Sequence, residues 1–486
     1  MEFLGVIVLV VSFLILLVLG VPIAFSIGIS GVLTMLVSID SLAALTTFAQ
    51  RMATGLDSFA LLAIPFFILA GNIMNRGGIA MRLIDLARVI VGRWPAGLAF
   101  VNVFANMLFG AISGSAGASA SAIGAIMKGE MKREGYDENF SAAVNISSAT
   151  TGLSIPPSNI LIVYSLASGG VSVAALFVAG YLPGILTGVS IMLMAMSMLI
   201  YKKSGIKATL KAIMVFVSVF AALALVILGL VAASGVSSLV YSLSIIALIF
   251  GVGFFITRKA LQKPTGFKRA LKILWRAVPS LMLLVVVIGG ILAGYFTATE
   301  ASAIAVLYAL ILALIYNEMT IRDLPKVVLQ SIRTTSIVLL LVATCIGLSW
   351  IMAYENIPQN VSDLLLGLSD NKFVILLIIN LILLFVGIFM DMTPAVLIFT
   401  PIFLPIVTEL GLDPIHFGII MVLNLSVGLC TPPVGSVLFI GCSVANVRIE
   451  KVIKPLIPMF IVMIISLLLV TYIPQISLWL PRVFGL

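Results

Sequence analysis

Two stretches of apolar sequence each hold a short polar motif followed by a pair of prolines. The first copy reads GAISGSAG (residues 110–117) and then TGLSIPPS (residues 151–158). The second copy reads GIFMDMTP (residues 387–394) and then VGLCTPPV (residues 427–434). One offset of 276 residues aligns Pro156 with Pro432 and Ser115 with Asp391. The residues that could do chemistry are therefore duplicated, although the two copies are chemically different.

The paired prolines should interrupt a membrane helix, because proline lacks a backbone N–H and clashes with the preceding turn. Gly152 and Gly428 each lie four residues before the first proline. Carbonyl oxygens freed inside a membrane need a ligand, and a dehydrated Na⁺ suits them, whereas a half-helix N-terminus favours an anion. Three nearby hydroxyls are hard oxygen donors of the kind that Na⁺ prefers: those of Ser113, Ser115 and Thr431. The alternative is a proline kink, or a G-x-x-x-G packing face at 110–114, without any ligand.

Asp391 lies within the second polar motif, in FMDMTP. A carboxylate at membrane depth is costly and indicates a functional role. It could coordinate a cation, take part in proton coupling or hold a substrate hydroxyl. It could also cap a helix that begins near Thr393 and Pro394, and this role is compatible with function.

The remaining polar residues point to structure rather than to catalysis. Glu300, in TATEAS, is explained equally well by a structural hydrogen bond and by a functional role. Three asparagines favour helix–helix hydrogen bonds over ligand roles: Asn145, Asn159 and Asn424. His416 has no second ligand at metal-binding spacing, and Cys345, Cys430 and Cys442 lie in apolar surroundings without CxxC spacing. With no P-loop either, we expect no enzyme activity, no catalytic residue and no cofactor besides a coupling Na⁺.

Composition excludes a water-soluble protein. Mean hydropathy is +1.29, and only 9% of the 486 residues are charged. Apolar runs long enough to cross a bilayer recur from residue 3 to residue 480, as expected of a multi-pass protein in the lipid bilayer. The first run is not a cleavable signal, because Glu2 precedes it without Lys or Arg and no cleavage site follows. The net charge of +9 is explained by basic loops that set orientation, so we expect no nucleic-acid partner.

The loops around the two copies carry opposite charge. Residues 95–127 are too few for two spans, which need about 40 apolar residues, and they fit a re-entrant hairpin. Basic residues flank this first hairpin and place both of its ends in the cytoplasm: Arg76, Arg82, Arg88 and Arg93 before it, and Lys128, Lys132 and Arg133 after it. Acidic residues flank the second copy: Glu355, Asp363 and Asp370 before it, and Glu409 and Asp413 after it. The second hairpin should therefore enter from the periplasmic side, as in the inverted repeats of secondary transporters.

These patterns predict an all-α polytopic membrane protein built as an inverted repeat, with two re-entrant helical hairpins and two broken helices. Residues 1–94 should form scaffold helices: a tilted span plus a short return at 3–37, a span at 58–74 and an amphipathic interfacial helix at 75–94. Residues 95–200 should form the first transport repeat, 277–371 the second scaffold half and 372–486 the second transport repeat with a terminal helix. Residues 201–276 should form an extra helical hairpin, from apolar runs at 213–233 and 237–256, with both ends in the cytoplasm.

Four long motifs stand out in the chain: FGAISGSAGASASAIGAIMKGEMKREGYDENFSAAV, GLSIPPSNILIVY, FTATEASAIAVLYAL and DMTPAVLIFTPIFLPIVTELGLDPIHFGIIMVLNLSVGLCTPPVGSVLFIGCSVANV. They closely resemble the large membrane subunit of TRAP (tripartite ATP-independent periplasmic) transporters. The resemblance covers nearly the whole chain and implies an elevator-type transporter of the bacterial inner membrane, which imports a carboxylate such as a C4-dicarboxylate or a sialic acid on a Na⁺ gradient. It implies two protein partners, a periplasmic substrate-binding protein and a small membrane subunit, expected here as a separate chain. The insertion at 201–276 is not part of the family's usual core.

The resemblance also implies site residues. One Na⁺ site would use Ser113, Ser115, Gly152, Ile155 and Pro157, and the second would use Gly387, Gly428, Thr431 and Val434. The substrate would lie near Asp391, Thr393, Ser154 and Asn159. The other hypotheses are a stand-alone Na⁺/anion elevator symporter without a binding protein, an intramembrane hydrolase and a passive channel. The hydrolase lacks a plausible base beyond His416, and a channel does not explain half-helices that end at mid-membrane from both sides.

Overall fold

The computed structural model describes residues 4–76, 78–94, 96–233, 267–369 and 371–486, and all regular structure in these ranges is helical. Seven of the described helices are long and apolar enough to cross a membrane. An eighth span is possible if α3 and the η1–α4 segment, which bend by 63° at a short break, count as one. The prediction of an all-α, multi-pass membrane protein is confirmed.

The first half of the chain runs from α1 to α10. Its helices are α1 (Leu4–Val18), α2 (Ile23–Ser38), α3 (Ser41–Leu56), α4 (Ala63–Arg76), α5 (Ile79–Ile90), α6 (Gly97–Ser113), α7 (Ala116–Arg133), α8 (Glu138–Ala149), α9 (Asn159–Ala167) and α10 (Val173–Ala233), with short turns η1 (Phe59–Leu62) and η2 (Thr151–Leu153). Aspartates start two of them, since the side chains of Asp40 and Asp137 accept hydrogen bonds from the N–H groups of Leu42 and Phe140.

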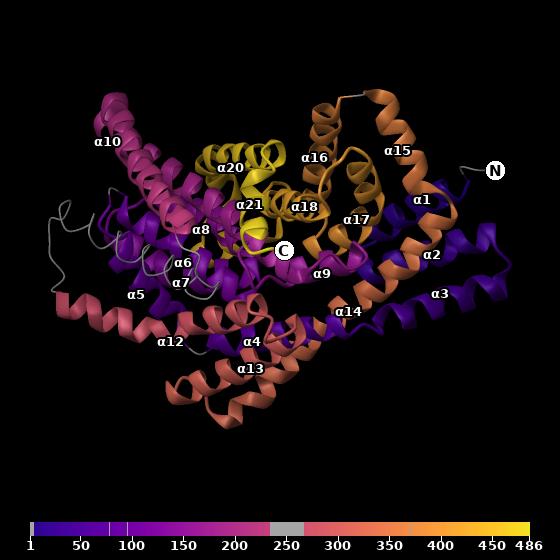
Figure 1. The fold of residues 1–486 in the computed structure, drawn as a ribbon, viewed down its shortest axis with the longest axis horizontal. Coiled ribbons are helices and arrows are strands. Elements are labelled where there is room, and N and C mark those ends of the chain that lie inside the picture. Colours follow the sequence, from indigo (N-terminus) through magenta and orange to yellow (C-terminus); the bar gives the residue numbers. More distant parts are fainter. Residues whose placement is uncertain (1–3, 77, 95, 234–266, 370) are drawn as a thin grey trace.

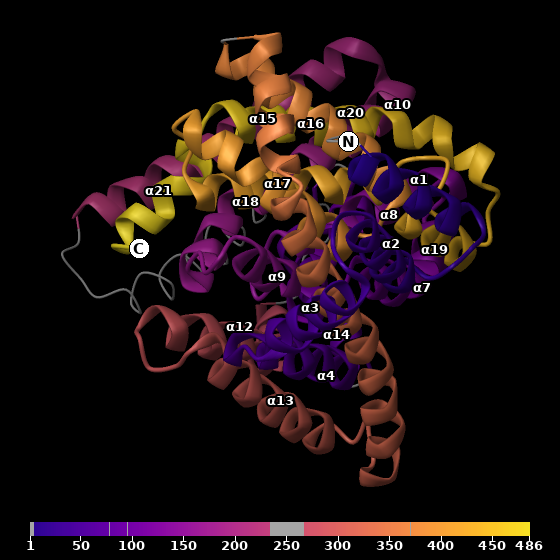
Figure 2. The ribbon, with the colours of Figure 1, turned by 90° about the vertical axis from the view of Figure 1, so that its right-hand side faces the viewer.

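The second half runs from α12 to α21. Its helices are α12 (Phe267–Leu292), α13 (Ala298–Ile315), α14 (Leu324–Tyr354), α15 (Ile357–Leu368), α16 (Lys372–Phe389), α17 (Met392–Glu409), α18 (Pro414–Gly428), α19 (Ser436–Ala445), α20 (Ile449–Tyr472) and α21 (Gln475–Val483), with the turn η3 (Ile321–Asp323). In Figures 1 and 2, α12 and α13 lie along one side of the molecule, and α16, α18 and α20 lie toward the other.

Two details of the N-terminal region differ from the sequence expectations. Residues 3–37 do not form one long span with a short return, because a turn that includes Gly20 (φ 78°) separates two packed helices of 15 and 16 residues. Residues 58–74 do not form a separate long span, since α4 has 14 residues and reaches spanning length only together with α3. The amphipathic segment forms a helix, α5, as expected, and its apolar face packs against α6 and α12. Its position at the membrane interface stays a prediction.

The insertion begins inside a helix. Helix α10 continues through residue 200 into the first apolar run, with one non-helical residue, Gly205 (φ 77°). The second apolar run, at 237–256, lies outside the described residues. The predicted boundary at 276/277 also falls within a helix, α12.

The two repeats are visible as matching helix boundaries. The first residues of α7 and α17, of α8 and α18, and of α10 and α20 are each separated by the offset of 276 residues seen in the sequence. The repeats also pack reciprocally: α19 packs on α7, and its counterpart α9 packs on α17. Ser466 donates a hydrogen bond to its equivalent, Ser190, at 3.0 Å. Contact between equivalent residues is expected where a two-fold axis passes between α10 and α20.

Candidate functional site at the two helix breaks

The first hairpin turns at Gly114 and Ser115, within the motif that the sequence singled out. Gly114 has a left-handed backbone (φ 62°), which glycine adopts without steric cost. Ser115 caps α7, since its Oγ accepts a hydrogen bond from the Ala118 N–H at 3.3 Å. Ser113 is buried and Ser115 is exposed, and the Ser113 Oγ lies 3.4 Å from the backbone N and O of Ser115. Two of the predicted Na⁺ ligands therefore lie together at this turn.

The first break is buried and lies directly against the hairpin. Residues 150–158 connect α8 to α9, all of them buried, and the Pro156–Pro157 peptide is cis. A Cβ placed on Gly152 would lie 2.4 Å from the Cα of Gly110, so the two backbones meet without a side chain between them. At the tip, a Cβ on Gly114 would lie 3.0 Å from the Asn159 Nδ2. The hairpin tip and the break thus form one unit.

The second repeat has the same construction. The hairpin turns at Met390 and Asp391, and the Asp391 Oδ1 accepts a hydrogen bond from the Met392 N–H at 3.0 Å, as a helix cap does. A Cβ on Gly428 would lie 2.6 Å from the Cα and carbonyl carbon of Gly387. The Pro432–Pro433 peptide is cis, like its counterpart. The expectation that Asp391 could cap a helix is confirmed, and Asp391 as a residue is exposed.

The two breaks differ in exposure. The first break is entirely buried, whereas Pro433 and Val434 in the second are exposed, Val434 by 44%. The Thr431 hydroxyl donates to the Val427 carbonyl at 2.9 Å, which leaves its oxygen lone pairs available. The second break is therefore the more accessible of the two.

The structure brings some predicted site residues together and separates one of them. Of the predicted Na⁺ ligands, Ser113 and Ser115 lie together at the first turn, and Gly387 lies against Gly428 at the second break. Ser154, predicted to lie near the substrate, instead faces α10: a Cβ on Gly180 would lie 2.1 Å from its carbonyl oxygen. Its side chain lines a small cavity with Thr187 of α10 and Met463 of α20. Of the residues predicted near the substrate, Asn159 adjoins the first tip, and Asp391 and Thr393 form the second.

Three buried polar atoms at the first break have no hydrogen-bond partner within the part of the chain that the structure describes. They are the Oγ atoms of Ser154 and Ser158 and the Oδ1 of Asn159. A buried polar atom without a partner costs about 1–3 kcal/mol, so such atoms mark places where a ligand or a water would be stabilising.

A buried asparagine that the sequence reading did not single out joins hairpin one to its broken helix. The Asn106 Nδ2 lies within hydrogen-bonding distance of the Asn145 Oδ1 (3.1 Å) and the Ser148 Oγ (2.9 Å). In the second repeat, the Asn424 Nδ2 donates to the Asn380 Oδ1 at 2.7 Å. The helix–helix role predicted for Asn145 and Asn424 is therefore confirmed. A polar residue inside an otherwise apolar helix was the available signal for Asn106 and Asn380.

Other polar residues have structural partners. Glu300 completes a capping box, because its carboxylate accepts from the N–H and the hydroxyl of Thr297, both at 2.8 Å. The His416 ring nitrogens lie 2.7 Å from the Ser477 Oγ and 3.3 Å from the Thr471 carbonyl oxygen. The three cysteines are buried and free. Over the described residues, no three His, Cys, Asp or Glu side chains group as a metal site.

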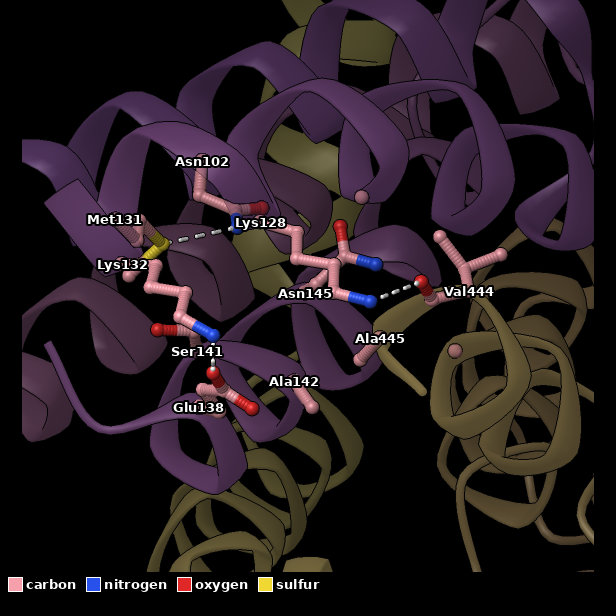
Figure 3. Close-up of a pocket in the computed structure, with 12 residues that line it drawn as sticks. Asn102, Lys128, Met131, Lys132, Glu138, Ser141, Ala142, Asn145, Val444 and Ala445 are labelled. Carbon is pink, nitrogen blue, oxygen red and sulfur yellow. Dashed lines mark hydrogen bonds and ion pairs between the residues drawn. The ribbon is translucent and has the colours of Figure 1, made fainter. Parts of the chain in front are cut away.

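A second small pocket lies where α7, α8 and α19 meet (Figure 3), with a free volume of about 20 Å³. The Lys128 Nζ donates to the Val444 carbonyl at 3.4 Å, near the end of α19, and so joins the two repeats. The Lys132 Nζ lies 2.5 Å from the Glu138 Oε1. The hydrogen bond and the charge of Lys132 lower the pKa of Glu138, and the same pairing raises the pKa of Lys132. This pocket contains no predicted site residue.

Comparison with known proteins identifies the family. The family model described as "Tripartite ATP-independent periplasmic transporter, DctM component" matches residues 10–476. The chain is 50% identical over 480 residues to the uncharacterized protein YgiK of Salmonella typhimurium, covering 99% of this chain and 98% of that one. It is 34% identical to the C4-dicarboxylate TRAP transporter large permease protein DctM of Rhodobacter capsulatus, covering 96% of each.

Among solved structures, the Alcanivorax borkumensis YdaH transporter matches 90% of this chain and 89% of its own, with a TM-score of 0.58 and 14% identity. At that identity the likeness concerns the fold alone. The family match and the full-length relatives show more: this chain belongs to the DctM family of TRAP transporters, as a large permease component and not as an enzyme.

Proposed function

We propose that this chain is the permease subunit of a Na⁺-coupled secondary transporter that imports a small organic acid by an elevator mechanism. The observation that carries the proposal is the paired hairpin–break unit. In each repeat, two glycines bring the hairpin backbone against the broken helix, Gly110 against Gly152 and Gly387 against Gly428. A cation held by hydroxyls and carbonyls of both segments would lock the hairpin to the break. In inverted-repeat transporters, coupling-ion sites are formed by the unwound backbone carbonyls of such broken helices.

In this proposal each unit holds one Na⁺. The first ion is bound by the hydroxyls of Ser113 and Ser115 and the backbone of the first break at Gly152, Ile155 and Pro157. The second is bound by Thr431 and the backbone of Gly387, Gly428 and Val434. Asp391, Thr393 and Asn159 contact the substrate, and Ser154 acts from behind the first break rather than from the substrate side.

A small carboxylate is the proposed substrate, either a C4-dicarboxylate, as for the DctM relative, or a sugar acid such as a sialic acid. The half-helix N-terminus of α9, which begins at Asn159, favours a negative group in front of it. The exposed Asp391 would instead accept a substrate hydroxyl or hold a cation between itself and the acid.

The remaining parts of the proposal concern partners and location. The family works as a tripartite system, so we propose that a separate small membrane subunit braces the helices α1–α4 and α12–α14, and that a periplasmic protein delivers the acid. The complex would lie in the bacterial inner membrane. The competing function is a stand-alone Na⁺/anion elevator symporter.

Uptake into proteoliposomes separates the two functions. The adjacent binding protein is first screened for ligands by its melting temperature, over C4-dicarboxylates and sugar acids. The acid that stabilises it is then supplied, radiolabelled, to vesicles that contain the large and small subunits. We expect uptake only with an inward Na⁺ gradient and the binding protein present. Equal uptake without the binding protein would favour the stand-alone symporter, and uptake with K⁺ in place of Na⁺ would refute Na⁺ coupling.

A further inference from the structure

A small cavity lies between the first break and the C-terminal end of α18, which leads into the second break. It is formed where η2, α18, α10 and α20 meet, and its free volume is about 10 Å³. That volume is near the minimum for a single water or a small ion. It is separate from the tip-facing Na⁺ ligand sets proposed above.

The cavity lies on the axis that relates the repeats. Its lining residues come in pairs that share the repeat offset: Thr150 with Ser426, Thr151 with Val427, and Thr187 with Met463. One turn further along the same two helices, Ser190 and Ser466 contact each other. A site in this position receives ligands from both repeats and belongs to neither alone.

The hydroxyls around the cavity present acceptors rather than donors. Those of Thr150, Thr151, Thr187 and Ser426 donate to carbonyls of their own helical segments, at 3.1, 2.6, 2.9 and 2.7 Å. A hydroxyl that has placed its proton in this way offers only lone pairs to a further neighbour. The fifth hydroxyl, Ser154, is 1% exposed, and its oxygen has no hydrogen-bond partner. The cavity is thus lined by five hydroxyl-bearing residues, four of which already donate their protons to carbonyls, and such oxygens suit the binding of a cation.

The electrostatics of the backbone point the same way. Helix α8 ends at Ala149 and helix α18 ends at Gly428, so the carboxyl ends of both half-helices meet at the cavity. A helix carboxyl end carries about half a negative charge, and in inverted-repeat transporters such ends coordinate Na⁺. Among the described residues, no Lys, Arg, Asp or Glu lines the cavity, so the helix ends and the hydroxyl dipoles dominate its field.

We propose that this axial cavity is a third Na⁺ site, with the hydroxyl oxygens of Ser154, Thr187, Thr150, Thr151 and Ser426 as its ligands. The inference rests on the proposed Na⁺ coupling and deepens it, because an ion here would join the two breaks to each other. A trapped water is the competing occupant.

Two variants remove oxygen ligands with little change in volume. Ser154→Cys replaces a hard oxygen by sulfur, and the equivalent position in the second repeat is already a cysteine, Cys430. Thr187→Val replaces the Thr187 hydroxyl by a methyl group of similar size. Ser147→Ala is the matched control, because the Ser147 Oγ is buried in the same helical segment and donates to the Ala143 carbonyl at 2.9 Å, but it does not line the cavity.

The measurement is equilibrium binding of ²²Na⁺ to the full chain with its small subunit in nanodiscs, with choline chloride to keep ionic strength constant. We expect the Ser154→Cys/Thr187→Val double variant to bind one Na⁺ fewer per chain than the wild type, while Ser147→Ala binds the wild-type number. A double variant that folds, as judged by gel filtration, and keeps the full number would show that the cavity holds water and overturn the proposal.

If the double variant does not fold, Ser426→Ala is measured in its place. Binding of one Na⁺ fewer per chain supports the proposal, and binding of the full number overturns it. Failure of the wild type to bind any Na⁺ would refute the proposed Na⁺ coupling, and the axial site with it. Full Na⁺ binding by a folded cavity variant, in contrast, refutes the axial site alone.

Discussion

Replacement of Gly152 by alanine tests whether the hairpin–break contact is the basis of the site. The added Cβ would lie 2.4 Å from the Gly110 Cα, 2.6 Å from its carbonyl carbon and 2.7 Å from the Ala111 nitrogen. Carbon atoms pack at about 3.5–4.0 Å, so the hairpin must move away from the break by about 1 Å. All three neighbours are backbone atoms, so no side-chain rotation can relieve the overlap.

The expected cost follows from that overlap. Overpacking a well-packed interior costs about 1–3 kcal/mol, and a rigid backbone contact belongs at the upper end of this range. The functional loss should be larger, because a shift of about 1 Å in a binding geometry can reduce activity about 100-fold. We therefore expect Gly152→Ala to lower the apparent melting temperature by a few degrees and to abolish Na⁺-dependent uptake.

The other glycines of the two contacts provide an internal ranking. The closest approach of the added Cβ is 2.6 Å at Gly428, 2.9 Å at Gly110 and 3.2 Å at Gly387. The damage should follow the same order, with Gly387→Ala the mildest. Gly129→Ala is the matched control, since that position in α7 has no neighbour within 4 Å, and alanine in a helix is favoured by up to about 1 kcal/mol. If Gly152→Ala had the same melting temperature and uptake rate as Gly129→Ala, the proposed role of the hairpin–break contact would be refuted.

Three further variants test single residues. Asp391→Asn should reduce uptake strongly without loss of expression, and full activity would leave Asp391 only its capping role. Tyr164→Phe removes the hydrogen bond from the Tyr164 hydroxyl to the Pro414 carbonyl (2.6 Å) that joins α9 to α18, and should cost about 1 kcal/mol by thermal melting, whereas an unchanged melting temperature would show that the bond contributes nothing. Glu300→Gln should keep full uptake, because glutamine forms the same capping box, and a loss of uptake with normal folding would assign the charge a transport role.

The hairpins and breaks were predictable because their signals are local. Paired prolines, glycines and serines interrupt apolar runs, and the turn at Gly114–Ser115 and the break at 150–158 fall within the predicted motifs. The N-terminal helices were harder to predict. A turn of only four residues, Leu19 to Pro22, is hidden within a continuous apolar run, and α3 carries Thr46, Gln50 and Arg51, which lower its hydropathy below that of a typical span.

The remaining features that the sequence did not reveal depend on contacts between segments far apart in the chain. The approach of Ser154 to α10 depends on Gly180, which faces the Ser154 carbonyl, and the neighbouring Gly184 faces Ile155 of the same break. The reciprocal packing of α9 on α17 and of α19 on α7 joins segments far apart in the chain. Neither leaves a periodic signal in its own segment. The cavity on the axis between the repeats is a product of that packing, so only the structure could reveal it.

Simultaneous uptake of ²²Na⁺ and the radiolabelled acid tests the central claim most directly. Vesicles that contain both membrane subunits, supplied with the binding protein, should take up Na⁺ and acid together at a fixed ratio greater than one. Ser113→Ala and Thr431→Val, one in each hairpin–break unit, should each weaken the dependence of uptake on Na⁺. Acid uptake without accompanying Na⁺, or Na⁺ entry at the same rate in the absence of the acid, would contradict the account.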